Sequence, residues 1–249
     1  MMRIFIYCWL IILLSHHLYA QEDSDKAFDG SVSSLIIGYG GDLAAGDLKD
    51  RFGNNLKFSL GGEHLTAGNW VYNADFIFFF GNNIKEDVLS SFRTNEGYIL
   101  GDDGLYADVF LRQRGLYLGG GIGRHFQFND KSRSGIKLTF NAGVLQHNIR
   151  FVDERNSVAQ LRSEGFKGYD RLTRGFSLKE TVAFKHLARN RRLNYEIGLD
   201  FVQGFTSEVR AINFDTGLPT NKSRLDLMFG IRVAWILPFY HNAQQTVYY

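Results

Sequence analysis

The sequence predicts an all-β fold: an eight-stranded antiparallel transmembrane β-barrel with short periplasmic turns and long extracellular loops. Three observations lead to this prediction. Large apolar residues alternate with polar or small residues along most of the 249-residue chain, which is the period of a strand with two different faces. Short and long connections alternate between these segments, and aromatic residues gather near both of their ends.

The first four predicted strands cover residues 31–41, 54–65, 69–80 and 115–127. Alternation is weaker in the first, SSLIIGYGG, and in the fourth, LYLGGGIGRHF. It is clear in the second, LKFSLGGEH, and in the third, NWVYNADFIFFF. Because successive side chains of a strand point to opposite faces, each segment presents one apolar and one polar face.

The other four predicted strands cover residues 135–149, 175–187, 192–206 and 223–238. The segments GIKLTFNAGV, LNYEIGLDFVQGF and SRLDLMFGIRVAWILPFY alternate clearly. The remaining segment, FSLKETVAF, is weaker because Glu180 falls on its apolar face. Nothing in the sequence explains the position of this acid.

Connection lengths distinguish the two ends of the predicted barrel. The short turns TAG, NDKSRS and LARNR follow the second, fourth and sixth strands, whereas the largest loops are 81–114 and 150–174. Outer-membrane barrels combine an even number of strands with short periplasmic turns and longer extracellular loops. Segments 44–53 and 85–92 could each form a helical turn within a loop.

Charged residues share the polar face of the predicted strands, which lines the lumen of a membrane barrel. An eight-stranded barrel is just wide enough for its side chains to fill, and buried charges must be paired because their desolvation is costly. We therefore predict an ionic plug, with a conducting pore as the alternative. Arg224, Asp226 and Arg232 are expected opposite acids such as Glu196 and Asp200. The predicted network comprises Lys57, Glu63, Asp75, Lys137, Lys179, Glu196, Asp200, Arg224, Asp226 and Arg232, and Lys185 lies on the same face.

Aromatic residues are expected to form two girdles, because amphipathic rings favour the level of the lipid headgroups. A soluble lipocalin-like barrel is the alternative, and it would turn the apolar face inward. Near the turn end we place Trp70, Tyr72, Phe126, Phe184, Tyr195 and Trp235, and near the loop end Tyr39, Phe80, Phe176 and Phe205.

The N-terminus has the pattern of a secretory signal. A basic start precedes the apolar run 4–14, which is short for a membrane-spanning helix, and cleavage is expected after Ala20. The only cysteine, Cys8, lies in this signal, so the mature chain has no thiol for disulfides, zinc or nucleophilic catalysis. The formal net charge of +2 does not indicate a nucleic-acid binder. The expected domains are a signal peptide (1–20), a periplasmic N-terminal arm (21–30), an outer-membrane barrel (31–240) and a periplasmic tail (241–249).

No catalytic, cofactor or metal site is predicted. The sequence contains no G-x-S-x-G motif and no metal-spaced histidine pair. The one arrangement suited to hydrolysis is His147 near the outer rim, with Asp153 and Ser157 in the following loop. Because a motif is absent, we interpret His147 as an ordinary interface histidine.

The two longest loops are the predicted partner-binding surface. They mix arginine with aromatic and aliphatic residues, as protein interfaces do. Loops that pack on one another to cap the barrel would need the same residue types, so both uses stay open. The candidate partner-binding residues are Arg93, Tyr98, Tyr106, Arg112, Arg150, Phe166, Tyr169 and Arg171.

Several segments, taken together, resemble a family of small outer-membrane β-barrel proteins from Bacteroidota. They are GDLAAGDLKDRFG (41–53), FRTNEGYILGDDGLYADVFLRQRG (92–115), LQHNIRF (145–151), KGYDRLTRG (167–175), NFDTG (213–217) and AWILPFY (234–240). The resemblance covers nearly the whole mature chain. It implies a single barrel in a Gram-negative outer membrane, similar in kind to barrel subunits that accompany secretion or barrel-assembly machines. It implies no catalytic residues.

We therefore expect a structural or accessory subunit of an outer-membrane assembly or secretion complex, without enzymatic activity and without a cofactor. Its expected partners are outer-membrane lipids and a larger outer-membrane barrel or surface lipoproteins, but not nucleic acid. One alternative is a small barrel enzyme that acts on lipid or peptide. Another is a stand-alone surface adhesin or stability barrel.

Overall fold

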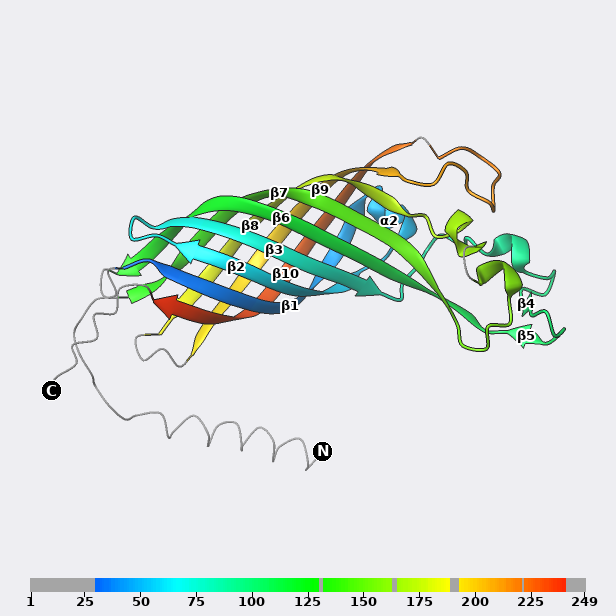
Figure 1. The fold of residues 1–249 in the computed structure, drawn as a ribbon, viewed down its shortest axis with the longest axis horizontal. Coiled ribbons are helices and arrows are strands. Elements are labelled where there is room, and N and C mark those ends of the chain that lie inside the picture. The colour runs from blue at the N-terminus through cyan, green and yellow to red at the C-terminus, as the bar shows by residue number, and fades with distance from the viewer. Residues whose placement is uncertain (1–29, 130–131, 163–164, 189–192, 221, 241–249) are drawn as a thin grey trace, which may run out of the picture.

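Eight long strands close into an antiparallel barrel in a computed structural model that describes residues 30–129, 132–162, 165–188, 193–220 and 222–240 (Figure 1). The expected signal peptide and C-terminal tail, and the N-terminal arm up to residue 29, lie outside the described residues. The order around the barrel is β1-β10-β9-β8-β7-β6-β3-β2, which confirms the predicted fold. The strands are β1 (Val32–Gly46), β2 (Asn55–Leu65), β3 (Trp70–Gly81), β6 (Val109–Asn129), β7 (Ser132–Asp153), β8 (Thr173–Leu187), β9 (Asn194–Glu208) and β10 (Ser223–Tyr240).

Short elements gather at one end of the barrel, called the loop end here, and the opposite end is called the turn end (Figure 1). Two of them, α2 and η2, fall within the segments expected to form helical turns. None of the helices among the described residues is long and apolar enough to cross a membrane. The short elements are α2 (Leu48–Arg51), η2 (Ser90–Phe92), β4 (Ile99–Leu100), β5 (Tyr106–Ala107), η3 (Ala159–Leu161) and η4 (Gly165–Gly168).

Strands β6 and β7 extend beyond the predicted bounds towards the loop end. Their pairing begins at Val109 opposite Asp153 and places Arg112 directly opposite Arg150. The prediction that these two arginines lie in loops is therefore wrong. Alternation between apolar and polar residues marks only the part of a strand that has lipid on one side, so it does not reveal strand ends beyond the lipid.

The apolar face of the strands points outward. On β10, Phe229, Ile231 and Trp235 are 49–57% exposed, whereas Asp226 and Arg232 are at most 4% exposed. The lipocalin-like alternative, with its apolar face inside, is thereby excluded, and the chain forms an outer-membrane barrel. All ten predicted girdle residues lie on the outward face, seven of them exposed and Phe80, Phe184 and Tyr195 half-buried. Tyr39 lies midway along β1, because that strand continues to Gly46.

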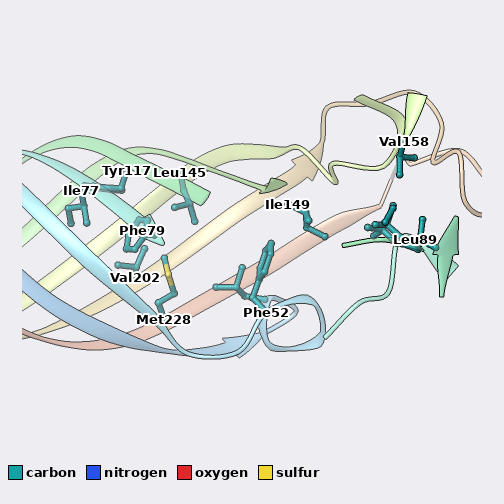
Figure 2. Packing of buried hydrophobic residues seen from close by; sticks show 14 residues of the cluster. Phe52, Ile77, Phe79, Leu89, Tyr117, Leu145, Ile149, Val158, Val202 and Met228 are labelled. Atoms are coloured by element: carbon teal, nitrogen blue, oxygen red, sulfur yellow. The ribbon is translucent and has the colours of Figure 1, made fainter. Parts of the chain in front are cut away.

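The barrel interior has three layers, which can be followed along β3. Val71 lies in an apolar layer at the turn end, Asn73 and Asp75 lie in a polar middle layer, and Ile77 and Phe79 lie in an apolar layer towards the loop end. Figure 2 shows this last layer continuing from the barrel into the loops. The lumen is therefore filled by two apolar layers as well as by charges, which the predicted ionic plug did not include.

Candidate functional site

A continuous chain of ion pairs crosses the middle of the lumen. Lys57 Nζ lies 2.7 Å from Asp42 and 2.8 Å from Asp200. Arg232 lies 3.6 Å from Asp200 and 2.8 Å from Glu196. Gly230 makes room for this arrangement, because a Cβ there would lie 1.8 Å from an Asp42 carboxylate oxygen.

The chain of ion pairs continues on the other side of Glu196. Lys137 Nζ lies 2.5 Å from Glu196 and 2.7 Å from Glu63, and Lys185 also binds Glu63. A further pair joins Lys179 to Asp75. We call these ten side chains the ionic layer: Asp42, Lys57, Glu63, Asp75, Lys137, Lys179, Lys185, Glu196, Asp200 and Arg232.

The ionic layer contains five cations and five anions, each at most 7% exposed. A dry, closed lumen requires equal numbers of positive and negative charges, because an unpaired buried ion is very costly. Eight of the ten network residues predicted from the sequence belong to this layer. Asp42 was missed because the first predicted strand ended at residue 41.

Arg224 and Asp226, the other two predicted network residues, form a separate group nearer the loop end. Asp226 lies 2.8 Å from His147 Nε2 and accepts a hydrogen bond from Thr206. Arg224 lies 3.4 Å from Asp226 and donates to the backbone oxygen of Asp47. The predicted position of Arg224 and Asp226 opposite Glu196 and Asp200 is therefore wrong, whereas Arg232 does meet both acids.

The arrangement for hydrolysis considered above is not assembled. His147 is buried inside the barrel beneath the Phe52 ring, which meets the imidazole edge-on at 5.4 Å. Ser157 instead donates to Asp153 at 3.2 Å, and Asp153 is the last residue of β7, six positions beyond His147 on the same strand. Among the residues that the structure describes, no group of three His, Cys, Asp or Glu side chains is placed to hold a metal ion.

A second ionic cluster joins all four loops at the loop end. Arg51 of α2 lies 2.8 Å from Glu86 and 2.5 Å from Glu208, and it donates to the Thr173 hydroxyl at 3.0 Å. Sequence reasoning missed Arg51 and Glu86, because their contacts join residues far apart in the chain. We call the joined loops the loop roof, formed by residues 47–54, 82–108, 154–162, 165–172 and 209–220.

Arg171 is the second centre of this cluster. Its guanidinium binds Glu86 at 2.7 Å and forms two hydrogen bonds to Asp215 at 2.6 and 2.9 Å. Its backbone has a positive φ of 49°, which is uncommon for a non-glycine residue. Arg171 is 3% exposed, so it joins the loops to one another and is not available to a partner.

The other predicted loop residues divide into inner and outer positions. Tyr169 packs edge-on against Phe92 and Phe214, with ring centroids 5.2 and 5.6 Å away, and Phe166 is half-buried. Arg93 is exposed and pairs with Asp87. Tyr98 and Tyr106 are exposed on the β4–β5 hairpin, with their rings 4.7 Å apart. The loops thus cap the barrel and leave an aromatic hairpin on their surface.

The loop roof is expected to open at acidic pH. Burial alone would raise the pKa of Glu86, but Arg51 and Arg171 outweigh it and hold this pKa below the ordinary 4.5. Burial is likewise outweighed at Asp215, where Arg171 holds the pKa below the ordinary 3.8. Carboxylates with a lowered pKa stabilise the folded state above their unfolded pKa, and this stability is lost as the pH falls through the folded pKa. Loop cleavage by pepsin should therefore accelerate as the pH falls below about 4.

Glu86→Gln provides the control for this pH dependence, since it removes one of the two titrating groups. The variant should show a shallower change of cleavage rate with pH. The same change in wild type and variant would contradict the role assigned to Glu86.

Several solved structures of outer-membrane proteins are similar to this chain. It is similar to Ail, the attachment invasion locus protein of Yersinia pestis, with 11% identity, 83% of this chain and 99% of that chain covered, and a TM-score of 0.45. It is also similar to the outer membrane protein OprG from Pseudomonas aeruginosa, with 11% identity, 85% of this chain and 97% of that chain covered, and a TM-score of 0.47. A third similar structure is the N-terminal β-barrel domain of Pseudomonas aeruginosa OprF, with 10% identity, 82% of this chain and 96% of that chain covered, and a TM-score of 0.37. No protein-family model and no curated protein match the sequence.

At these identities and TM-scores the similarity does not indicate the function of this chain. The resemblance to a Bacteroidota family, and the kinship with accessory subunits that it implies, stay predictions.

Proposed function

We propose that this protein is a plugged accessory subunit of an outer-membrane assembly or secretion complex, and that it docks to a larger barrel through its lipid-facing wall. The observation that carries the proposal is the carboxylate of Glu180 on that wall. Ionisable side chains at membrane depth are rare because they are costly, and they mark functional positions by default.

Glu180 lies at the middle of β8, between Phe140 of β7 and Phe201 of β9 in the strand register. One carboxylate oxygen accepts a hydrogen bond from Gln203 at 3.1 Å. The other is buried and has no hydrogen-bond partner among the described residues. A polar pair therefore interrupts the apolar wall, and half of its hydrogen-bonding capacity is unused.

A hollow of about 610 Å³ lies beside Glu180. Gly41, which has no side chain, lines it together with the apolar side chains of Leu199, Phe229 and Ile231. Small residues that allow close approach, together with hydrogen bonds between polar side chains, are what membrane proteins use to associate within lipid. We infer that a side chain with a hydrogen-bond donor, from a neighbouring membrane protein, enters this hollow.

The rest of the molecule supports a role at the wall. The lumen is filled by its three layers, and the loop roof is occupied by contacts among its own residues. We orient the loop end towards the outside of the cell and the turn end towards the periplasm, since longer loops are extracellular in outer-membrane barrels. We propose no enzymatic activity, because His147 is buried with Asp226, whereas Ser157 donates to Asp153.

A photo-crosslinking residue at Ile231 should capture the partner in native membranes, whereas the same residue at Leu118, on β6 across the barrel, should not. Glu180→Leu should reduce the crosslinking yield at Ile231 by about three- to thirtyfold. This is the effect expected from losing one hydrogen bond between polar side chains of neighbouring membrane-spanning segments. Mass spectrometry then identifies the partner. A clean monomer, or equal capture at both positions, would contradict docking through this wall.

The β4–β5 hairpin favours a second candidate function, that of a stand-alone adhesin. Tyr98, Leu100, Leu105 and Tyr106 are 50–61% exposed on this hairpin, and exposed apolar patches commonly mark interaction sites. An adhesin would purify as a monomer and would give no crosslinks from Ile231. Its binding to surfaces would be lost in the double variant Tyr98→Ser/Tyr106→Ser.

A further inference from the structure

Three arginines gather on the outward face of β6 and β7 near the loop end. Arg112 and Arg150 are direct neighbours across the two strands, and Arg114 lies two residues further along β6. Arg112 and Arg150 are exposed, whereas Arg114 is half-buried, with its guanidinium carbon 6.0 Å from the centroid of the Phe78 ring.

These arginines lack the partners that most other charges of the molecule have. Within the described part of the chain, none of the three forms an ion pair with a carboxylate, and Arg114 donates only to the backbone oxygen of Gln113. Like charges directly opposite one another on neighbouring strands are destabilising. A bound anion would remove this repulsion between Arg112 and Arg150.

The cluster lies at the level of the lipid headgroups. Along β6 the outward face is apolar or small between Arg114 and Arg124, including Leu116, Leu118 and Ile122. Ten residues of strand span roughly 34 Å, which at a tilt of about 40° corresponds to about 26 Å across the bilayer. This matches the apolar band of outer-membrane barrels, which is about 25 Å tall. Arg124 marks the other boundary and stacks on Trp70, with its guanidinium carbon 5.0 Å from the ring centroid.

A hollow of about 400 Å³ adjoins the cluster. Arg112 and Arg114 line one side, and Leu56 and Phe80 supply apolar surface at the upper edge of the wall. The site therefore combines guanidinium donors, which suit the geometry of phosphate, with a surface on which an acyl chain can lie.

We propose that Arg112, Arg114 and Arg150 bind the phosphorylated sugar headgroup of an outer-leaflet glycolipid, whose acyl chain packs against Leu56 and Phe80. The proposal uses the orientation given above but not the docking at Glu180, which lies on another part of the wall. Bound lipid would supply the counter-charge that the chain itself does not provide.

The test is a titration of the purified barrel in detergent micelles with bis-phosphorylated lipid A and with the same lipid after removal of its phosphates, with bound lipid counted by native mass spectrometry. The phosphorylated form should bind at least about tenfold more tightly. Arg112→Gln/Arg150→Gln should abolish this preference. Arg124→Gln, which removes an arginine from the opposite boundary, should retain it. Gel mobility before and after heating checks that each variant is folded.

Two further ligands distinguish the sources of phosphate. Inorganic phosphate at equal concentration should leave lipid A bound, and phosphatidylglycerol should bind more weakly than lipid A. Full displacement by inorganic phosphate would show an anion site without lipid specificity. A preference for phosphatidylglycerol, or equal losses in Arg124→Gln and the double variant, would likewise overturn the proposal.

Discussion

Arg232→Leu is expected to lower the stability of the barrel by about 3–5 kcal/mol, the usual effect of removing one partner from a buried ion pair. Arg232 contacts Glu196 and Asp200 and is 4% exposed. Without it, the ionic layer would hold four cations and five anions, between two apolar layers that exclude water. The temperature at which the folded band disappears from a detergent gel measures the loss, with circular dichroism as a second readout.

Two variants separate loss of charge from loss of packing. Leu227→Ala truncates a half-buried outward side chain of the same strand and should be milder. Arg232→Leu/Glu196→Gln restores equal charge, with four cations and four anions, and should recover part of the lost stability. If the double variant is no more stable than Arg232→Leu alone, charge balance does not explain the effect.

Arg51→Met is expected to release the loop roof while leaving the barrel folded. Arg51 holds Glu86 of the loop roof and Glu208 at the end of β9. A hydrogen bond to a charged group contributes roughly 1.5–3 kcal/mol, less where a partner is half-exposed as Glu86 is. Cleavage of the loops by trypsin or thermolysin at neutral pH should accelerate by about tenfold or more. The strands should stay protected, and the heat-dependent gel shift should be kept.

Arg93→Met is the matched control, because Arg93 also pairs with an acid at the loop end but is exposed, as is its partner Asp87. Such pairs contribute little to stability, so its cleavage rate should stay near that of wild type. Equal acceleration in both variants would mean that loop protection does not depend on the buried cluster.

Period-two alternation, together with the alternating loop lengths and the aromatic residues near both strand ends, was sufficient to predict the closed barrel and the inward face of its strands. The reason is that a barrel in lipid must separate an apolar outside from a polar inside at every strand, so Lys57, Glu63 and Arg232 could be placed from local sequence alone. The same rule marked Glu180 as an exception, and the structure places it beside Gln203 and a hollow in the wall.

Contacts between distant residues could not be predicted in this way. Alternation does not show that Ile77 and Phe79 form an apolar layer inside, because both faces of FIFFF are apolar. It does not show that Arg171 meets Asp215, because loop conformation depends on packing between segments that are separate in sequence. Arg112 and Arg150 were assigned to loops because the alternation of apolar and polar residues stops where β6 and β7 extend beyond the apolar band of the barrel.

The ionic layer is unevenly divided between the two sides of the barrel. Strands β1 to β3 contribute Asp42, Glu63 and Asp75 against Lys57, three anions and one cation, a charge of −2. Strands β7 to β10 contribute four cations, Lys137, Lys179, Lys185 and Arg232, against Glu196 and Asp200, a charge of +2. Each half of the sheet alone would carry uncompensated charge into lipid, at a cost of several kilocalories per mole for each ion. We therefore expect the two halves to come together before either enters the hydrocarbon, with insertion and closure of the β1–β10 seam in a single step.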